Sequence, residues 1–260
     1  MSFRWRVESS LFVLPKGGAG VEECEDAAAA SEEALAFAVA DGATEAFDAR
    51  RWARRLAEGW VRESPAPAAA GEFGAWVAAE GERHQAEWAG ASLPWYAEEK
   101  RRAGSFAAFV GVRFEEAGGD STVASGTRLR WRAVALGDSC LVQLRGAALV
   151  AALPLDDAAA FNSSPPLVPS AEALREAALA RAVFREGEAR AGDTFFLLSD
   201  AAAAWFFEAR GRGQARLAEF DSLAAASENE RLAEFVRRER REGLMKDDDV
   251  AVLRIQVVCA

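Results

Sequence analysis

The sequence predicts an α+β fold with antiparallel sheets, and three observations support this class. Short apolar runs with two-residue alternation, typical of strands, come in groups along the chain. Amphipathic segments with a helical period are clustered between these groups and do not alternate with single strands. Arg145-Gly146 separates two short apolar runs, which is typical of a β-hairpin. This grouping favours antiparallel sheets over a doubly wound parallel sheet.

The first 42 residues predict two strands and a connecting turn region. Residues 3–7 alternate apolar or aromatic side chains with arginines, the period of a half-buried strand. Residues 14–25 contain three glycines and are expected to form turns or a hairpin. Residues 34–40 (ALAFAVA) form a short apolar run that ends at Asp41-Gly42. This pattern predicts a buried strand that breaks into a turn.

Two helices are expected next. Over residues 47–61 the large apolar side chains recur mostly at four-residue steps, with arginines on the opposite face, which indicates an amphipathic helix. Residues 64–71 (SPAPAAAG) predict a loop that is too short to separate two domains. The second helix is expected over residues 72–88. It contains His84, the only histidine of the chain, whose charged neighbours predict a surface position.

The remainder of the chain continues this mixed pattern. Strands are expected at residues 105–115 and 127–136, separated by a turn around residues 118–120, and an exposed loop is expected at residues 156–170. The other expected strands are residues 140–144, 148–153, 182–186, 194–199 and 250–258, and the other expected helices are residues 171–180, 201–208 and 229–242.

Composition restricts the class of partner. The net charge of −10 disfavours a nucleic-acid backbone, because binding to phosphates depends on a basic surface. Three widely spaced cysteines (Cys24, Cys140 and Cys259) form no zinc-binding pattern and fit a reducing compartment, with each expected to be a small buried residue. No stretch approaches the roughly 18 apolar residues of a membrane span. We therefore expect a cytoplasmic protein without a membrane partner, and the oligomeric state stays open.

Three aspartates lie where a predicted strand begins or ends. Asp41 follows FAVA, Asp200 follows FFLLS, and Asp248 or Asp249 precedes VAVLRI. Carboxylates at neighbouring strand ends can converge on a hard cation such as Mg²⁺ or Mn²⁺. However, Asp-Gly is a common turn and Ser-Asp a common helix start, so each aspartate alone fits a structural position better. Spacing by itself leaves both interpretations open.

Four segments together resemble the motifs of one family. FAVADGATEAF resembles the strand and Asp-Gly turn of the metal-dependent 2C-type (PPM) protein phosphatases, and RAVALGDSCLVQLRGAAL resembles their Gly-Asp-Ser hairpin. DTFFLLSDAAAAWF and KDDDVAVLRI resemble the two later aspartate motifs, in the family's order. Upstream, VEECEDAA is similar to the segment that faces the metals. The resemblance covers residues 3–257 and is closest to the small bacterial members.

The resemblance implies a fold, an activity and a set of site residues. The fold would be a four-layer α/β/β/α sandwich of two antiparallel sheets flanked by helices, with residues 1–260 as one domain. The activity would be hydrolysis of phosphoserine or phosphothreonine in a phosphorylated protein by a hydroxide that bridges two manganese (Mn²⁺) or magnesium (Mg²⁺) ions. The residues that the resemblance assigns to the metals are Asp41, the Gly42 carbonyl, Asp200 and Asp248 as ligands, and Glu25 and Asp26 as holders of metal-bound waters.

The same comparison of motifs assigns secondary positions. Asp249 takes the Asn/Asp slot after the last ligand, and Asp138 is expected to be a structural turn residue. Asp156 or Asp157 is a weak candidate for a third ion. Trp205 is more readily a core residue than part of the site. The run at residues 237–241 is expected to cover a solvated helix face.

The sequence also departs from the family's motifs. Val21 occupies the slot where many members have a phosphate-binding arginine, and Ala43 the slot where some have a histidine. Ala201 replaces a glycine, which matters only if that residue needs a positive φ. Cys140 and Ala251 are further replacements that remove no proposed ligand. The alternative is therefore a catalytically weak or inactive 2C-like scaffold that binds a phosphorylated partner; a phosphomonoesterase for small molecules is a third hypothesis.

Overall fold

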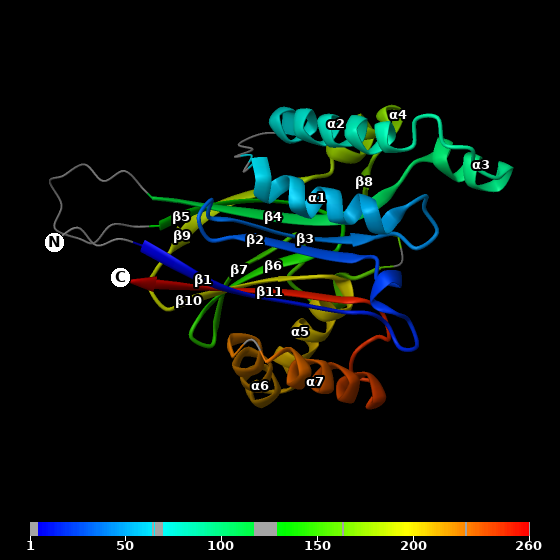
Figure 1. Cartoon of the computed structure of the whole chain (residues 1–260). Helices are drawn as coiled ribbons and strands as arrows, with labels where there is room; N and C mark the ends of the chain where they lie inside the picture. Colours follow the sequence, from blue (N-terminus) through cyan, green and yellow to red (C-terminus); the bar gives the residue numbers. More distant parts are fainter. Residues whose placement is uncertain are drawn as a thin grey trace, which may run out of the picture.

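Two antiparallel β-sheets pack face to face between two layers of helices (Figure 1). The computed structural model describes residues 5–63, 65, 70–116, 129–162, 164–226 and 228–259. The five-stranded sheet has the order β1 (Trp5–Leu14), β11 (Val250–Cys259), β10 (Asp193–Leu198), β6 (Cys140–Arg145) and β7 (Ala148–Leu153). The six-stranded sheet has the order β2 (Asp26–Ser31), β3 (Ala36–Gly42), β4 (Phe106–Glu116), β5 (Leu129–Leu136) and β9 (Val183–Ala189), and β8 (Val168–Pro169) pairs with β4.

The helices form the outer layers. The helices next to the six-stranded sheet are α1 (Ala49–Glu63), α2 (Ala70–Glu87) and α4 (Glu172–Leu179), with α3 (Trp95–Ala103) projecting beyond them (Figure 1). The helices next to the five-stranded sheet are α5 (Asp200–Arg212), α6 (Gln214–Ala225) and α7 (Asn229–Arg241). Two short 3₁₀ turns are η1 (Val21–Glu23) and η2 (Ala158–Ala160). None of the described helices is long and apolar enough to cross a membrane.

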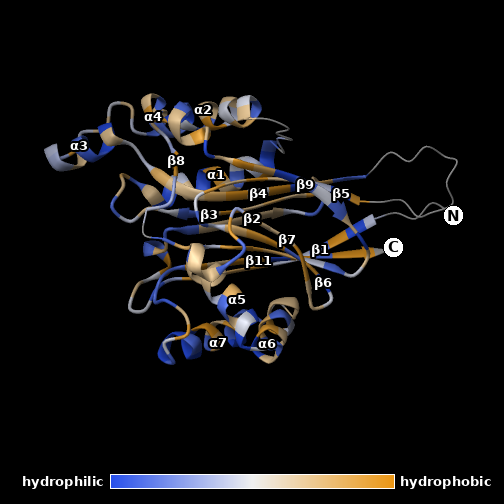
Figure 2. Ribbon diagram, turned by 180° about the vertical axis from the view of Figure 1, so that it is seen from behind, coloured by the Kyte–Doolittle hydropathy of each residue, from blue (hydrophilic) through white to orange (hydrophobic). Residues whose placement is uncertain are grey.

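Two-residue alternation in the central strands creates three separate cores. In β10, Phe195 and Leu197 face the other sheet, while Phe196 and Leu198 face the α5–α7 layer. In β3, Phe37 and Val39 face the other sheet and the intervening alanines face α1. Because both faces of these strands are covered, they read as continuous apolar runs. Figure 2 shows the same distribution, with hydrophobic colour concentrated along the strands.

The predicted α+β class and the α/β/β/α sandwich are both confirmed. The predicted turn at residues 118–120 lies outside the described residues, as does the start of the first predicted strand. The sequence patterns did not predict α3, α6 or the short strand β8. They also gave no strand signal within the residues of β2 itself. Strand β2 is almost all alanine (DAAAAS), a residue with low strand propensity, so its pairing with β3 is what makes it a strand.

Two predicted surface positions were wrong. His84 is only 2% exposed, and its Nε2 lies 2.9 Å from the Ser105 hydroxyl between α2 and β4. The predicted solvated face of residues 237–241 contains Glu239, which is fully buried and accepts a hydrogen bond from Trp205 Nε1. In both cases tertiary packing covers a polar side chain and supplies its hydrogen-bond partner.

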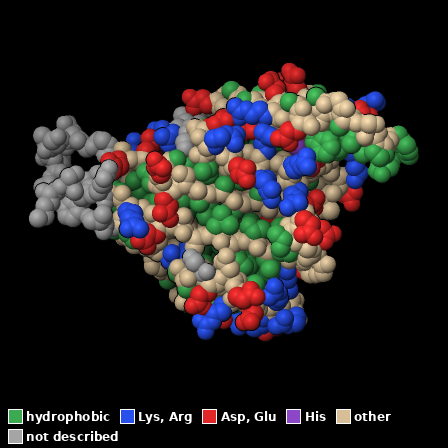
Figure 3. All heavy atoms as spheres, viewed as in Figure 1, with side chains coloured by type: hydrophobic (Ala, Val, Ile, Leu, Met, Phe, Trp, Pro, Cys, Tyr) green, Lys and Arg blue, Asp and Glu red, His purple; other side chains and the backbone are tan. Residues whose placement is uncertain are grey.

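The surface of the molecule carries mixed charge on the face shown in Figure 3. On the face shown in Figure 3, basic and acidic side chains are intermixed, and hydrophobic side chains reach the surface at the tip occupied by α3. Trp95 and Tyr96, at the start of α3, are 79% and 59% exposed.

Candidate metal centre

A cavity of about 300 Å³ lies at one end of the two sheets, and six acidic residues are among those that line it. This is the end at which β3 stops and β11 begins, on the right of Figure 1. Its carboxylates come from both sheets and their loops: Glu25, Asp41, Asp138, Asp200, Asp248 and Asp249. The structure therefore brings together the three strand-end aspartates that the sequence singled out.

Asp41 and Asp26 are neighbours because strands β2 and β3 pair. The register places Asp26 opposite Asp41, at the end of the sheet. Burial raises the pKa of both carboxyls well above the ordinary value; the charges of Asp26 and Asp200 add to this at Asp41. One buried oxygen of Asp26, Oδ2, has no hydrogen-bond partner. Raised pKa values of neighbouring carboxyls indicate that no nearby positive charge compensates Asp26 and Asp41.

Gly42 follows Asp41 in a narrow space. A Cβ at this residue would lie 2.8 Å from the Ala49 carbonyl oxygen and 3.1 Å from that of Glu25. The Gly42 N–H donates to the same Glu25 carbonyl at 3.2 Å. The absence of a side chain therefore allows three backbone segments to meet beside Asp41, so the residue after this aspartate has to be a glycine.

Asp200 and Asp248 come from the other sheet. The Ser199 hydroxyl accepts a hydrogen bond from the Ala251 N–H at 2.9 Å, which ties the end of β10 to the start of β11. Asp200 is the first residue of α5, where a carboxylate also interacts favourably with the helix dipole. Ala201 lies inside α5 and has no positive φ, so the replacement of glycine by alanine causes no backbone strain.

Asp249 and Glu25 organise the loops around the cavity. Asp249 is 5% exposed and accepts the backbone N–H of Lys16 at 2.8 Å and of Glu25 at 2.7 Å. It thereby holds the loop after β1 and the segment before β2 against the start of β11. Glu25 lines the cavity, and burial raises its pKa. Asp249 thus fixes the positions of two loops through hydrogen bonds, whereas Glu25 faces the cavity.

Asp138 belongs to the cavity, although sequence reasoning treated it only as a turn residue. It is 8% exposed, and burial, followed by the charge of Asp200, raises its pKa to about 6. Gly137 precedes it with φ +114°, and a Cβ there would lie 2.4 Å from the Ala108 Cβ. The β5–β6 turn therefore packs directly on β4. The signal was the Gly-Asp pair, which also lies at a strand end.

Lys246 is the second residue that sequence reasoning missed. Its Nζ lies 2.6 Å from Asp248 Oδ2 and 3.3 Å from Asp200 Oδ2. The hydrogen bond to Asp248 raises the pKa of Lys246 above its ordinary value. Nothing in the sequence motif distinguishes this lysine from a solvated one beside three aspartates.

Other candidates from the sequence lie elsewhere. Asp157 is exposed and accepts the Ala159 N–H at the start of η2, and among the described residues neither it nor Asp156 lines the cavity. Trp205 is buried against Phe220 and Phe235 in the α5–α7 core. Val21 is 75% exposed on η1, and Ala43 lines the cavity.

The donor set of the cavity fits a hard divalent cation. All its charged donors are carboxylate oxygens, the ligands that Mg²⁺ and Mn²⁺ prefer. The unpartnered Asp26 oxygen and the raised pKa of Asp41 indicate missing positive charge at the same place. Within the described residues, however, no three His, Cys, Asp or Glu side chains already form a closed ligand cluster. Lys246 lies against two of the proposed ligands.

Sequence comparison finds no match for the chain, whereas structural comparison finds proteins of the same fold. No protein-family model and no curated protein matches the chain significantly. The Ser/Thr phosphatase PstP/Ppp of Mycobacterium tuberculosis is 18% identical, with a TM-score of 0.64 over 96% of this chain and 98% of that chain. The catalytic domain of the Ser/Thr phosphatase PstP in complex with two manganese ions is also 18% identical, with a TM-score of 0.63 over 98% and 100%.

A third similar structure has a regulatory description. PppA, a key regulatory component of T6SS in Pseudomonas aeruginosa, is 18% identical, with a TM-score of 0.53 over 98% of this chain and 100% of that chain. At this level of identity the likeness shows the fold. The chain has the fold of the 2C-type (PPM) Ser/Thr phosphatases.

Proposed function

We propose that this chain is a metal-dependent phosphatase that acts on phosphoserine or phosphothreonine in proteins, with residues 1–260 as one phosphatase-like domain. The observation that carries the proposal is the convergence of Asp41, Asp200 and Asp248 on one acidic cavity at the end of the sandwich. Carboxylates from both sheets are buried there at an electrostatic cost that packing does not require. Bound Mn²⁺ or Mg²⁺ would remove that cost.

Each residue has a definite role in this proposal. Asp41, the Gly42 carbonyl, Asp200 and Asp248 would hold the ions, and Glu25 and Asp26 would accept hydrogen bonds from the waters around them. When bound, two such ions activate a water and neutralise phosphoryl charge. Asp249 would keep the two loops that carry Lys16 and Glu25 in position. Lys246 and Thr44 line the cavity and are exposed, so a phosphorylated side chain could reach it from solvent there.

The alternative is a scaffold of the same fold that binds a phosphorylated partner without hydrolysis. The observations in its favour are the exposed Val21 and the small Ala43, which supply neither a cation nor a proton donor at the mouth of the cavity. The fold is also shared with PppA, whose description is regulatory. The presence of all three strand-end aspartates in one cavity favours the enzyme, since a scaffold has no need to bring them together.

Hydrolysis of an aryl phosphate tests the proposal. We expect turnover with Mn²⁺, less or equal turnover with Mg²⁺, and none in chelator. Asp41→Ala and Asp200→Ala should each lose more than about 10²-fold, since even partners outside the ligand set are worth 10–100-fold. Asp157→Ala removes an exposed carboxylate that does not line the cavity and is the matched control.

The same assay separates the alternatives. A folded protein that binds Mn²⁺ in calorimetry but turns over neither the aryl phosphate nor a phosphoserine peptide would identify the scaffold. Turnover of the aryl phosphate with no preference for phosphopeptides would indicate a small-molecule phosphomonoesterase. Turnover that survives chelator or both aspartate substitutions would contradict the proposal.

A further inference from the structure

Positive charge is scarce among the residues that line the acidic cavity. Among the described residues that line it, Lys246 is the only Lys or Arg. It faces a set of six acidic side chains: Glu25, Asp41, Asp138, Asp200, Asp248 and Asp249. The position of Lys246 therefore determines how much of the negative charge of the cavity is compensated before a metal ion binds.

The backbone of Lys246 is well anchored, although its side chain is 63% exposed. Its neighbour Met245 is 4% exposed in the α5–α7 core, and the Met245 N–H donates to the Glu239 carbonyl at 3.2 Å. The Lys246 carbonyl accepts the Asp248 N–H at 3.1 Å, closing a turn. The side chain is thus directed from a fixed turn into the mouth of the cavity.

The ammonium connects two proposed ligands that come from different elements. Its Nζ lies 2.6 Å from Asp248 Oδ2, at the start of β11, and 3.3 Å from Asp200 Oδ2, at the start of α5. A single exposed pair of this kind contributes little to stability. Here one cation contacts two carboxylates of a larger cluster.

Oδ1 of Asp200 accepts the Ala201 N–H and Oδ1 of Asp248 accepts the Asp249 N–H, so the two oxygens that contact the ammonium are the ones left for a divalent cation. Mg²⁺ binds oxygens at about 2.0–2.1 Å and repels a neighbouring positive charge, so the ammonium cannot keep both contacts when an ion enters. Because the lysine side chain is flexible and exposed, it can leave towards solvent without unfolding the turn.

We propose that Lys246 is a built-in counter-ion of the cavity, which stabilises the metal-free protein and which a divalent cation has to displace. Lys246 therefore weakens the affinity for the ion and sets the ion concentration at which the site fills. The claim that a metal ion displaces Lys246 rests on the metal site of the proposed function. The claim that Lys246 stabilises the protein concerns the chain without metal and does not depend on that site.

Calorimetric titration with Mn²⁺, without substrate, tests the displacement. Lys246→Met should bind Mn²⁺ about tenfold more tightly than wild type, equivalent to about 1.4 kcal/mol. Lys246→Arg, which keeps the charge, should stay close to wild type. Lys100→Met is the matched control, because Lys100 pairs with the exposed Glu45 at 3.6 Å and does not line the cavity. It should leave the affinity unchanged.

Thermal unfolding in chelator tests the counter-ion itself. Lys246→Met should lower the melting temperature relative to Lys100→Met, and saturating Mn²⁺ should remove the difference. Unchanged affinity together with an unchanged melting temperature would overturn the inference and leave Lys246 as an ordinary surface residue. If neither wild type nor Lys246→Met binds Mn²⁺, the metal site and the displacement both fail, and the melting temperature in chelator alone decides whether Lys246 is a counter-ion.

Discussion

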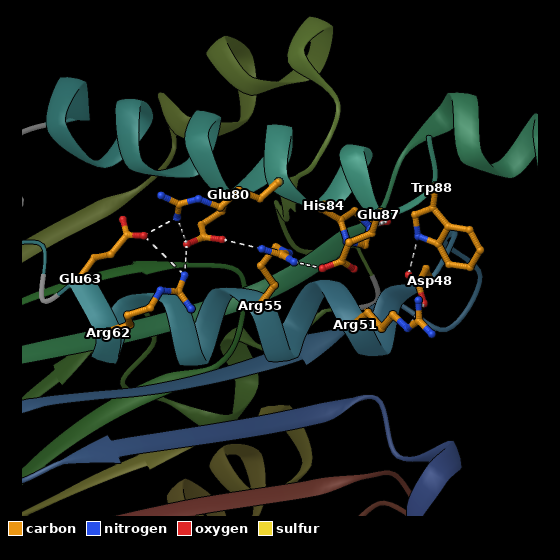
Figure 4. A network of polar contacts seen from close by, with 11 residues as sticks. Asp48, Arg51, Arg55, Arg62, Glu63, Glu80, His84, Glu87 and Trp88 are labelled. Atoms are coloured by element: carbon orange, nitrogen blue, oxygen red, sulfur yellow. Dashed lines mark hydrogen bonds and ion pairs between the residues drawn. The ribbon is translucent and has the colours of Figure 1, made fainter. Parts of the chain in front are cut away.

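Two groups of carboxylates in this protein differ in how their negative charge is compensated. Between α1 and α2, Glu80 is fully buried, and three arginines surround it (Figure 4). Its oxygens lie 3.2 Å from Arg55, 2.7 Å from Arg62 and 2.7 Å from Arg83. Every charge in this network has a partner, and the network joins the two helices above the six-stranded sheet.

The acidic cavity contains more carboxylates and less compensation. Asp138 lines the cavity, and Asp26 does not line it but lies opposite the lining residue Asp41; each is 8% exposed. Among the described residues that line the cavity there is no arginine, and Lys246 is the single cation. Burying an uncompensated charge is costly, so a fold keeps it only where something else supplies the opposite charge. The comparison suggests a criterion: a structural carboxylate such as Glu80 is neutralised by basic side chains of the protein, whereas a carboxylate that binds a ligand is left with few such partners.

Removing Glu80 should have the largest effect on stability. Glu80→Ala leaves three arginines that converge on an empty position, and we expect a loss of about 3 kcal/mol in the free energy of unfolding. Urea denaturation measures it. Glu82→Ala, an exposed glutamate of the same helix, should change stability by less than about 0.5 kcal/mol. Equal losses for the two variants would show that the network is not structural.

Removing a carboxylate from the cavity should have the opposite sign. Asp41→Asn keeps the shape of the side chain but relieves repulsion from Asp26 and Asp200, so in chelator we expect a gain of about 1–2 kcal/mol. Saturating Mn²⁺ should stabilise wild type and leave the variant unchanged. Urea denaturation in both conditions provides the measurement. A loss of stability in chelator would mean that Asp41 is a structural residue.

The difference between the two groups could be predicted only in part from the sequence. FAVADG and FFLLSD each place an aspartate after a run that is apolar on both faces, so the strand ends were predictable. Their meeting point depends on the packing of two sheets, which the family resemblance supplied. The motif order assigned Asp41, Asp200 and Asp248 to a metal site; the three line one cavity, and their role as ligands stays a prediction.

Side chains with long-range partners were not predictable. Glu80 and His84 lie among charged residues on α2, and the local pattern gives no reason to bury them. Their partners come from other elements: α1 supplies Arg55 and Arg62 to Glu80, and the residue just before β4, Ser105, lies beside His84. The contact of Lys246 with Asp200 was not predictable for the same reason, since the two residues are far apart in sequence.

The two regions should also respond oppositely to pH. Asp138 has a pKa of about 6 in the folded protein, above its ordinary value of 3.8, because of burial and the charge of Asp200. The unfolded chain therefore releases this proton first. As pH rises from about 4 to 6 in chelator, the metal-free protein loses the stability that the protonated carboxyl provides.

His84, beside the arginine network, has the reverse shift. Burial, followed by the charge of Arg55, lowers its pKa from 6.5 to about 4, so the unfolded chain takes up the proton first. Stability from His84 is present above about pH 6.5 and is lost as pH falls towards 4. Denaturation of wild type, Asp138→Asn and His84→Gln across pH 4–7 in chelator measures both. Relative to wild type, Asp138→Asn should gain stability as pH rises and His84→Gln as pH falls; parallel curves would mean that neither burial nor neighbouring charge separates the two regions.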